Sequence, residues 1–436
     1  MEKTTLLKHF AEDIGGTSYV LWKEGTEAEN LSRAVEYLSI AEWPKGVPRT
    51  MDGLVTLLLG MCRESPRTIV FDELPFLLES VETAYTSVQS LVDELPEGSK
   101  LIACGSKLIA CGSRMSIMTD ILHRERNPLY GRFQGMELGP MPFEDTCLLH
   151  PWMSDIDQIR MYLVYGGMPQ SHLVFSGETF RDSIERWYLD DRALVEPYVR
   201  GRVTGEVRNG PRHERVVEAV AKGRTSMKEI AEFAGMTESQ TRMFLDELTD
   251  LRIIGTYRPM AGAPKRPRYR LEDGMVDLWY SVFEDRPTFY APDDVSQRYE
   301  MVREHVDSVL GHRFEAFCRE YLERRYRCLE TGSWWGVERD EDGDRTWADV
   351  DVVARVSYGR STYMLFAECK FRSRPATRGD LRRLEARASG LSDAPKLIVF
   401  SAGWFDDSIR EEAESVGAVL VGLDELMGRS ETPGLG

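Results

Sequence analysis

The residues best suited to chemistry are two acids and a lysine in the last third of the chain, Asp351, Glu368 and Lys370. Glu368 and Lys370 are two positions apart in the apolar run 364–370, so a strand would point both side chains to one face. Asp351 lies in a second such run, 349–354. If the two strands pair as a hairpin, the three side chains converge, and two carboxylates beside a lysine could bind Mg²⁺ and activate water.

The surrounding elements fit a hydrolytic site of this kind. A helix starting near 311–317 brings Glu315 as an auxiliary acid, and the run 396–401 predicts a further strand. A Glu-x-Lys on a strand alone usually marks a solvated face, so the prediction depends on the combination. The arginine-rich segment 370–387 could bind a phosphodiester backbone beside the site, or could be the solvated face of an amphipathic helix.

A second candidate group stands at the start of the chain. Lys3 and Thr4 fill the last two places of a phosphate-binding loop, G-x-x-x-x-G-K-[ST], whose lysine reaches the phosphates and whose hydroxyl holds Mg²⁺. Glu2 stands where the final glycine belongs and brings a carboxylate towards those phosphates, so we expect ATP hydrolysis by this chain to be impaired. Taken alone, Lys-Thr-Thr is also an ordinary helix start.

Two apolar segments follow in the first half. The run 67–75 ends in Asp72 and Glu73, as a buried parallel strand does where its carboxyl end opens into a site, although adjacent acids are equally common at a helix N-terminus. The sequence Lys-Leu-Ile-Ala-Cys-Gly-Ser then occurs twice in succession, at 100–106 and 107–113. We favour the second copy as a core strand, because it leads directly into a helical stretch, and expect the first to bulge out as a loop.

These motifs, with the segments 128–132 and 165–169, resemble those of archaeal and bacterial AAA-type P-loop ATPases with a C-terminal restriction-endonuclease-like domain. The resemblance implies an α/β fold: a P-loop NTPase-type parallel sheet with a helical lid, then a winged helix, then a PD-(D/E)xK nuclease-like α/β domain. The implied cofactors are ATP and Mg²⁺. In the last domain Asp351, Glu368 and Glu315 would bind the metal.

The resemblance also implies roles for residues of the first domain. Asp72 would bind Mg²⁺ together with the threonine of the loop, and Glu73 would polarise the attacking water. Ser113 would sense the γ-phosphate. Arg132 would stabilise charge on the phosphates, although a surface arginine in a loop is an equal alternative. Met1 falls where the family pattern has a valine, and we hypothesise that the reading frame continues upstream.

Residues 209–290 carry the pattern of a winged helix. Three amphipathic stretches, the third preceded by the capping residue Thr237, predict a helix-turn-helix, and 253–257 and 268–271 predict the strands of a wing. The third helix is net acidic, which disfavours entry into the major groove of DNA. The wing, 258–270, has five basic residues and no acid. It could contact DNA without reading sequence, or pack on neighbouring domains.

Composition limits the remaining possibilities. The chain has 436 residues and a net charge of −17, so DNA contact must come from local basic patches. No apolar run is long enough for a membrane span, and the cysteines form no metal-binding or disulfide pattern. We expect a cytoplasmic protein that could oligomerise. The predicted domains are a truncated ATPase core (1–145), a lid (146–208), the winged helix (209–290) and the nuclease-like domain (300–430).

Two classes of function remain. In the first, a DNA-associated protein of the ATPase family controls a C-terminal Mg²⁺-dependent nuclease. In the alternative, a degenerate ATPase core and an inert nuclease-like domain form a non-catalytic scaffold or interaction protein, which the missing loop glycines and the duplication favour. Nucleotide titration and a nicking assay separate the two.

Overall fold

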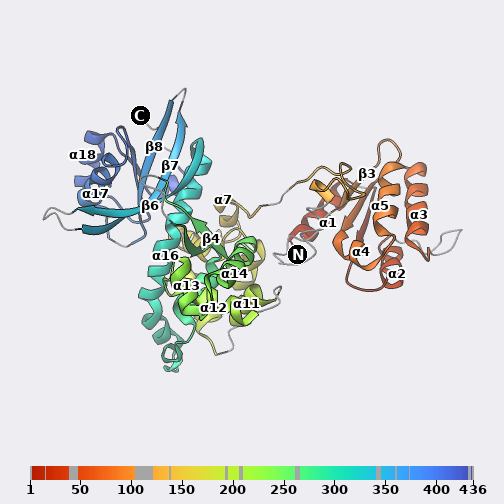
Figure 1. Ribbon diagram of the computed structural model, residues 1–436, viewed down its shortest axis with the longest axis horizontal. Helices are drawn as coiled ribbons and strands as arrows, with labels where there is room; N and C mark the ends of the chain where they lie inside the picture. Colours follow the sequence, from red (N-terminus) through yellow and green to blue (C-terminus); the bar gives the residue numbers. More distant parts are fainter. Residues whose placement is uncertain are drawn as a thin grey trace. The chain divides into compact units, whose positions relative to one another are not determined.

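The computed structural model divides the chain into two compact units, Met1–Gly139 and Pro140–Gly436. The boundary precedes the predicted one at residue 145, so α7 (Phe143–Cys147) belongs to the second unit. Figure 1 draws the first unit in red to orange and the second in yellow to blue. The described residues are 2–14, 16–38, 48–103, 121–136, 139–191, 195–205, 210–260, 266–339, 345–358, 361–372, 374–430 and 434.

A three-stranded parallel sheet organises the first unit, in the order β1-β2-β3. The predicted mixed α/β fold with a parallel sheet is therefore confirmed. The core on the sheet includes the fully buried Trp22, Leu58 and Phe71. The elements of this unit are α1 (Glu2–Ile14), β1 (Thr17–Leu21), α2 (Glu27–Tyr37), α3 (Met51–Glu64), β2 (Thr68–Asp72), α4 (Leu74–Ser80), α5 (Ala84–Asp93) and β3 (Lys100–Ala103).

The strand beside β2 comes from the first copy of the tandem repeat, so our preference for the second copy was wrong. After α5 ends at Asp93, the chain needs only residues 94–99 to reach β3, which pairs with β2 from Thr68 to Phe71. A strand that follows its helix so closely reaches the open edge of β2 before any later segment. The second copy, with Ser113, lies outside the described residues.

The second unit opens with a helical region that leads into the segment predicted to be a helix-turn-helix. Short helices and turns bury aromatic side chains such as Tyr165, Phe175 and Tyr188 among themselves. After α7 the elements are α8 (Asp155–Tyr165), α9 (Pro169–Phe175), α10 (Phe180–Ile184), η1 (Glu185–Leu189) and α11 (Val195–Thr204).

Three helices and an antiparallel strand pair then follow in the order predicted for a winged helix. Capping boxes start the second and third helices, at Ser226 with Glu229 and at Thr237 with Gln240. Gly235 ends the second helix in the left-handed conformation at φ 66°, which glycine adopts without a steric penalty. The elements are α12 (Gly210–Ala221), α13 (Met227–Ala234), α14 (Glu238–Asp250), β4 (Ile254–Tyr257) and β5 (Arg268–Leu271).

A 31-residue helix, α16 (Val295–Arg325), links this part to the C-terminal sheet, after α15 (Gly274–Leu278), η2 (Trp279–Phe283) and η3 (Pro287–Tyr290). In Figure 1 it runs from the α11–α14 region to the sheet. The sheet has the order β10-β9-β8-β7-β6. Its strands and helices are β6 (Cys328–Arg339), β7 (Arg345–Tyr358), β8 (Ser361–Lys370), α17 (Arg378–Ser389), β9 (Lys396–Ser401), α18 (Asp407–Val416), β10 (Val419–Val421) and α19 (Leu423–Leu426).

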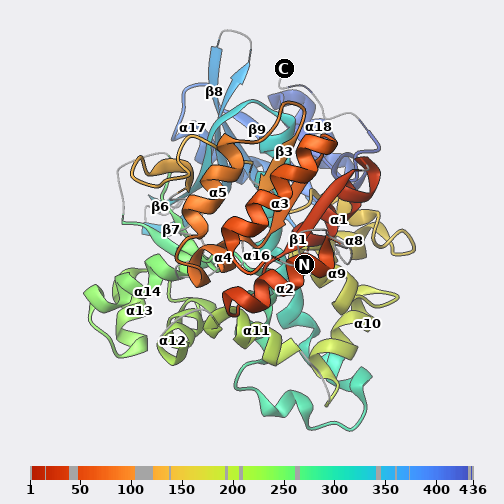
Figure 2. The same cartoon turned by 90° about the vertical axis from the view of Figure 1, so that its right-hand side faces the viewer.

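Helices cover both faces of this sheet. Val399 packs with Leu384 of α17, and the next residue of β9, Phe400, meets the ring of Tyr321 on α16. Because successive side chains of a strand point to opposite faces, α16 and α17 lie on opposite sides. Figure 1 shows α17 and α18 together at one side of the strands, and Figure 2 shows the same domain turned by 90°. The sheet is thus buried on both faces, as its apolar strands predict.

Candidate functional site

The candidate site lies where β7 and β8 separate. The predicted hairpin is present, and its two strands pair from Tyr358 and Ser361 as far as Val352 and Ala367. One residue further on, Asp351 no longer pairs with β8 through its backbone. Its side chain takes over instead, because Oδ2 accepts a hydrogen bond from the backbone N–H of Cys369 at 2.7 Å.

The glutamate and lysine of β8 are in direct contact at this point. Lys370 Nζ forms an ion pair with Glu368 Oε1 and lies 4.0 Å from Asp380 Oδ1 on α17. Glu368 is nearly buried, at 8 % exposure, whereas Cys369 between them points into the opposite core. The alternation expected for Glu368, Cys369 and Lys370 is therefore what the strand adopts.

Burial and like charge act together on Asp351. Its pKa is raised well above the ordinary value, first by burial and then by the negative charges of Glu368 and Glu315, while the Cys369 N–H and the Lys370 charge act in the opposite direction. The charge of Glu315 on α16 is thus near enough to Asp351 to raise its pKa. The structure thus brings together Asp351, Glu368, Lys370 and Glu315, the four residues predicted for the C-terminal site.

Asp380 is a site residue that the sequence analysis missed. It is buried, and its carboxylate pairs with Arg372 at 2.7 Å and Arg383 at 2.6 Å as well as facing Lys370. Burial opposes its charge, but the N–H of Thr377 and the charges of Arg372 and Lys370 outweigh burial and lower its pKa. The only sequence signal was Thr-x-x-Asp, which predicts a helix cap and gives no hint of the lysine.

The basic segment 370–387 is largely neutralised within the domain. Arg378 and Arg382 pair with acids of α18, Arg387 donates to the carbonyl of Asp349, and Arg372 and Arg383 bind Asp380 as described. Arg374 is exposed. The segment therefore offers less free positive charge than its composition predicts.

The wing arginines split into two groups. Arg268 lies between the rings of Trp335 and Trp347, 4.8 Å from each centroid, and Arg270 Nη1 donates to Glu315 Oε2 at 2.9 Å. Both contacts are with α16 and the first two strands of the C-terminal sheet. Arg258 and Arg266 are exposed, and Lys265 lies outside the described residues. Two of the four described basic residues of the wing thus pack on the neighbouring part of the chain.

A divalent metal fits this site by the chemistry of its donors. Carboxylate oxygens are the ligands that Mg²⁺ prefers, and the negative charges that crowd Asp351 would be relieved by a bound cation. Within the described ranges, no three carboxylate, histidine or cysteine side chains are grouped so that together they could hold a metal ion, so a site here would use two protein ligands. Lys370 and Arg270 hold Glu368 and Glu315 through ion pairs. Asp351 and Glu368 are the two ligands that the arrangement favours.

The acids predicted for the nucleotide site lie at the carboxyl end of β2. Asp72 is fully buried, and its Oδ2 accepts a hydrogen bond from Tyr19 Oη at 2.6 Å, while its Oδ1 has no hydrogen-bond partner among the described residues. Glu73 follows in the left-handed conformation, at φ 58° and ψ 40°. A non-glycine residue held there is strained, and such strain often marks functional positions.

Lys3 and Thr4 begin α1, which packs against β1 and β2. Because α1 joins β1 through residues 15 and 16 alone, it must run antiparallel to the strand. Its first turn therefore lies towards the edge of the sheet where Asp72 ends β2.

Arg132 is committed to a local ion pair. Its guanidinium binds both carboxylate oxygens of Asp93, at 2.7 and 2.9 Å, and donates to the carbonyl of Pro128 at 2.9 Å. The pair lowers the pKa of Asp93. The structure therefore favours the structural alternative, since a phosphate would have to displace Asp93.

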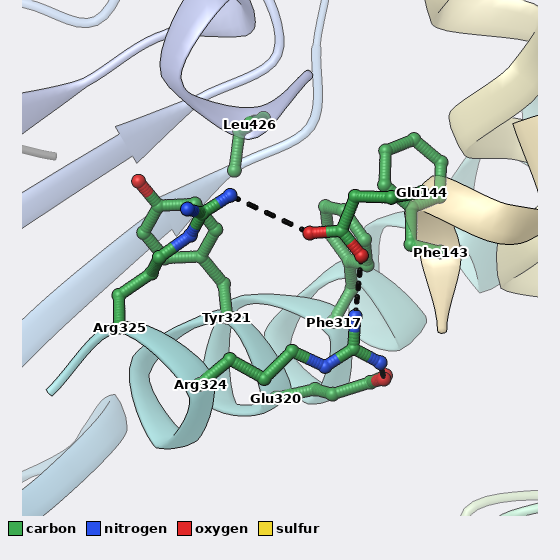
Figure 3. Close-up of a pocket in the computed structure, with 8 residues that line it drawn as sticks. All are labelled: Phe143, Glu144, Phe317, Glu320, Tyr321, Arg324, Arg325 and Leu426. Atoms are coloured by element: carbon green, nitrogen blue, oxygen red, sulfur yellow. Dashed lines mark hydrogen bonds and ion pairs between the residues drawn. The ribbon is translucent and has the colours of Figure 1, made fainter. Parts of the chain in front are cut away.

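A shallow pocket in the second unit lies on the last turns of α16, below α7 and α19 (Figure 3). Glu144 projects into it and pairs with Arg324 at 2.6 Å and Arg325 at 3.4 Å, as the dashed lines show. Arg324 also pairs with Glu320. The charged groups of the pocket therefore pair with one another. We infer that these ion pairs hold α7 against the end of α16 and that the pocket is structural.

Comparison with known proteins finds a family model that matches one segment of the chain. Residues 279–385 match the DUF234 family, described as archaeal and bacterial proteins of unknown function. The resemblance to archaeal and bacterial proteins is thereby confirmed. An uncharacterized protein of Methanocaldococcus jannaschii is 22% identical over 302 residues, which cover 66% of this chain and 67% of that protein.

Two solved structures are also similar to this chain. The ORC2 protein of Aeropyrum pernix, solved in ADPNP–ADP complexes, aligns over 70% of this chain and 84% of its own, with 13% identity and a TM-score of 0.39. The DNA modification-dependent restriction endonuclease AspBHI aligns over 41% of this chain and 56% of its own, with 12% identity and a TM-score of 0.19. Separately, every helix in the described ranges is too short or too polar to cross a bilayer.

Proposed function

We propose that the C-terminal domain is a divalent-metal-dependent nuclease. The observation that carries the proposal is the separation of β7 and β8 at Asp351, where this half-buried acid meets the strand segment that carries Glu368 and Lys370. A purely structural hairpin gains nothing from gathering acids in a buried position, because their mutual repulsion opposes folding.

In phosphodiester hydrolysis the two acids and the lysine would have different roles. Asp351 and Glu368 would hold Mg²⁺, which supplies charge stabilisation to the phosphoryl group and lowers the pKa of water. Lys370, between Glu368 and Asp380, holds a positive charge where the attacking water and a phosphate oxygen would meet. Its amine can donate to that oxygen or orient the water.

DNA is the substrate that the chain's surface favours. Arg258, Arg266 and Arg374 are exposed basic side chains of the second unit, and Trp404 is 58% exposed. Arginines bind phosphates without reading sequence, and an exposed indole can stack on an unpaired base. Because the chain carries a net charge of −17, binding must depend on such local groups and weaken steeply with salt.

We further propose that the first unit binds ATP with Mg²⁺ and hydrolyses it weakly. Asp72 and Glu73 end the central strand, and the first turn of α1 with Lys3 and Thr4 lies towards the same edge. Glu2 at the loop position usually taken by glycine opposes the phosphates. ATP titration followed by calorimetry tests binding, and phosphate release tests turnover. Absence of binding at millimolar ATP would contradict this part.

A nicking assay on supercoiled plasmid tests the nuclease. The full chain should nick DNA with millimolar Mg²⁺ or Mn²⁺ and lose this activity with EDTA, in Glu368→Ala and in Lys370→Ala. Glu414→Ala, an exposed glutamate on α18, is the matched control and should keep full activity. Nicking that survives in both site variants would refute the assignment. A wild-type chain that neither nicks nor binds metal would support the non-catalytic scaffold instead.

A further inference from the structure

The hairpin formed by β4 and β5 is built into the nuclease-like domain. Met260, just after β4, donates its N–H to the carbonyl of Ser333 at 3.1 Å, and Pro259 bridges to the same residue of the edge strand β6. Gly332 makes this approach possible, since a Cβ there would lie 2.7 Å from Met260. The hairpin thus covers an edge that would otherwise be open.

A second set of contacts fixes the hairpin to α16. Arg313 donates to the carbonyl of Glu272 at 2.8 Å, directly after β5. Arg319 lies over the ring of Tyr257 at 5.2 Å, and Arg270 lies over the same ring at 5.5 Å. The guanidinium of Arg270 is therefore held in one place by an aromatic ring that is itself anchored, so little conformational entropy opposes its contacts.

The group that Arg270 meets is an acid of the candidate site. Its Nη1 binds Glu315 Oε2 at 2.9 Å, with the Glu315 side chain only 14% exposed. Arginine does not lose its charge in proteins and binds the same carboxylate oxygens that a metal would use. The Glu315 carboxylate therefore cannot keep its ion pair with Arg270 and at the same time bind a metal ion with both oxygens.

We propose that Arg270 is a positioning residue that competes with a divalent metal for Glu315, so that docking of the hairpin limits the metal site to Asp351 and Glu368. This inference rests on the proposed metal site. Under this proposal the winged-helix segment acts on the metal site of the nuclease-like domain through Arg270, and this action does not require contact with DNA. It also revises the expected role of Glu315, which becomes a metal ligand only when Arg270 withdraws.

Mn²⁺ binding to the full chain, measured by calorimetry, tests the proposal. Arg270→Gln should bind Mn²⁺ on the order of tenfold more tightly than wild type, about 1.4 kcal/mol. Arg266→Gln removes the same charge from an exposed position of the hairpin and should stay within about twofold. Equal or weaker binding by Arg270→Gln, in a variant whose thermal unfolding shows it folded, would overturn the proposal.

Glu315→Gln supplies the second arm of a double-mutant cycle. In the wild-type background it should change Mn²⁺ affinity by less than about twofold, because Arg270 already holds Glu315; in Arg270→Gln it should abolish the gain. A loss in the wild-type background would also contradict the competition. Asp351→Asn separates this from the proposed function: if Asp351→Asn leaves Mn²⁺ binding intact, the metal site itself is wrong. If Asp351→Asn abolishes Mn²⁺ binding while Arg270→Gln binds Mn²⁺ as tightly as the wild type, the metal site is supported and only the proposed role of Arg270 is wrong.

Discussion

Asp351 Oδ2 accepts the backbone N–H of Cys369 at 2.7 Å, at the first position where β7 no longer pairs with β8. The side chain thus replaces a backbone partner that the separating strands cannot supply. The same burial makes its negative charge unfavourable, and Glu368 and Glu315 add to the effect, so the pKa of Asp351 is raised. The site is held by a residue whose charge opposes folding.

Asp351→Asn should therefore stabilise the metal-free protein at pH 7.5. The folded-state pKa lies above the unfolded value, so stability is lost as the pH rises from the unfolded value through the folded one, and asparagine, which carries no charge, escapes this loss. The amide oxygen of asparagine still accepts the Cys369 N–H. Chemical denaturation in EDTA should show a gain of about 1 kcal/mol.

Asp349→Asn is the control for this prediction, because Asp349 is exposed on the same strand. It should leave stability within about 0.5 kcal/mol. Mn²⁺ should stabilise the wild type and leave Asp351→Asn unchanged. If the wild type is more stable than Asp351→Asn in EDTA, the negative charge of Asp351 does not destabilise the folded chain and the prediction is wrong.

Glu73→Gly should stabilise the first unit. Glu73 has a φ of 58°, a conformation that costs a residue with a Cβ roughly 1–2 kcal/mol and costs glycine almost nothing. Glycine also makes the unfolded chain more flexible, which lowers the stability of the folded state by about 0.5–1 kcal/mol. Hydrogen exchange of the β2 amides should show a net gain of about 0.5–1 kcal/mol. Glu79→Gly, within α4, should instead cost about 1 kcal/mol. Equal losses in both variants would argue against strain at Glu73.

Gly274→Ala should destabilise the second unit. A Cβ at this position would lie 2.4 Å from the carbonyl oxygens of both Leu163 and Val164, and neither α8 nor α15 can move without disturbing its packing. We expect a loss of about 2–3 kcal/mol in thermal or urea denaturation. Gly311→Ala on α16 meets no atom within 4 Å and should gain up to about 1 kcal/mol from helix propensity. Similar effects of the two substitutions would contradict the close approach.

Local patterning predicts the strand residues of the C-terminal site. Period-two alternation assigns Glu368 and Lys370 to one face, and the short connection between two apolar runs predicts the hairpin that brings Asp351 beside them. The parallel sheet of the first unit is predicted for the same reason, from a buried apolar run that ends in acids. Each inference uses neighbours in sequence or one short turn.

Contacts between distant elements are beyond such reasoning. Arg270 and Glu315 are 45 positions apart, and a basic run in a hairpin does not reveal which acid of another element will face it. Asp380 has a complete local explanation as a helix cap, which conceals its contact with Lys370. The two identical repeat copies cannot be distinguished by pattern at all; the length of the connection from α5 decides between them.

The last prediction concerns a buried histidine pair in the helical region. His172 Nε2 lies 2.6 Å from the carbonyl of Gly166 and must donate to it, so Nδ1 accepts from Nε2–H of His150 at 2.9 Å. This chain of two hydrogen bonds requires the His172 ring to be neutral, because its Nδ1 must accept. Burial lowers the pKa of His172 to about 4, with the Gly166 carbonyl acting against burial and His150 adding to it, and burial also lowers the pKa of His150.

Stability of the second unit should therefore fall as the pH drops from about 6.5 towards 4. In that interval the unfolded chain binds a proton that folded His172 excludes, and the loss amounts to about 3 kcal/mol at full effect. His172→Gln keeps a donor for Gly166 and should flatten the pH dependence between pH 7 and 5, whatever its own stability. His312→Gln, which removes an exposed histidine, should leave the slope unchanged. Urea denaturation at several pH values measures both slopes, and parallel curves for wild type and His172→Gln would exclude this pair as the source of acid sensitivity.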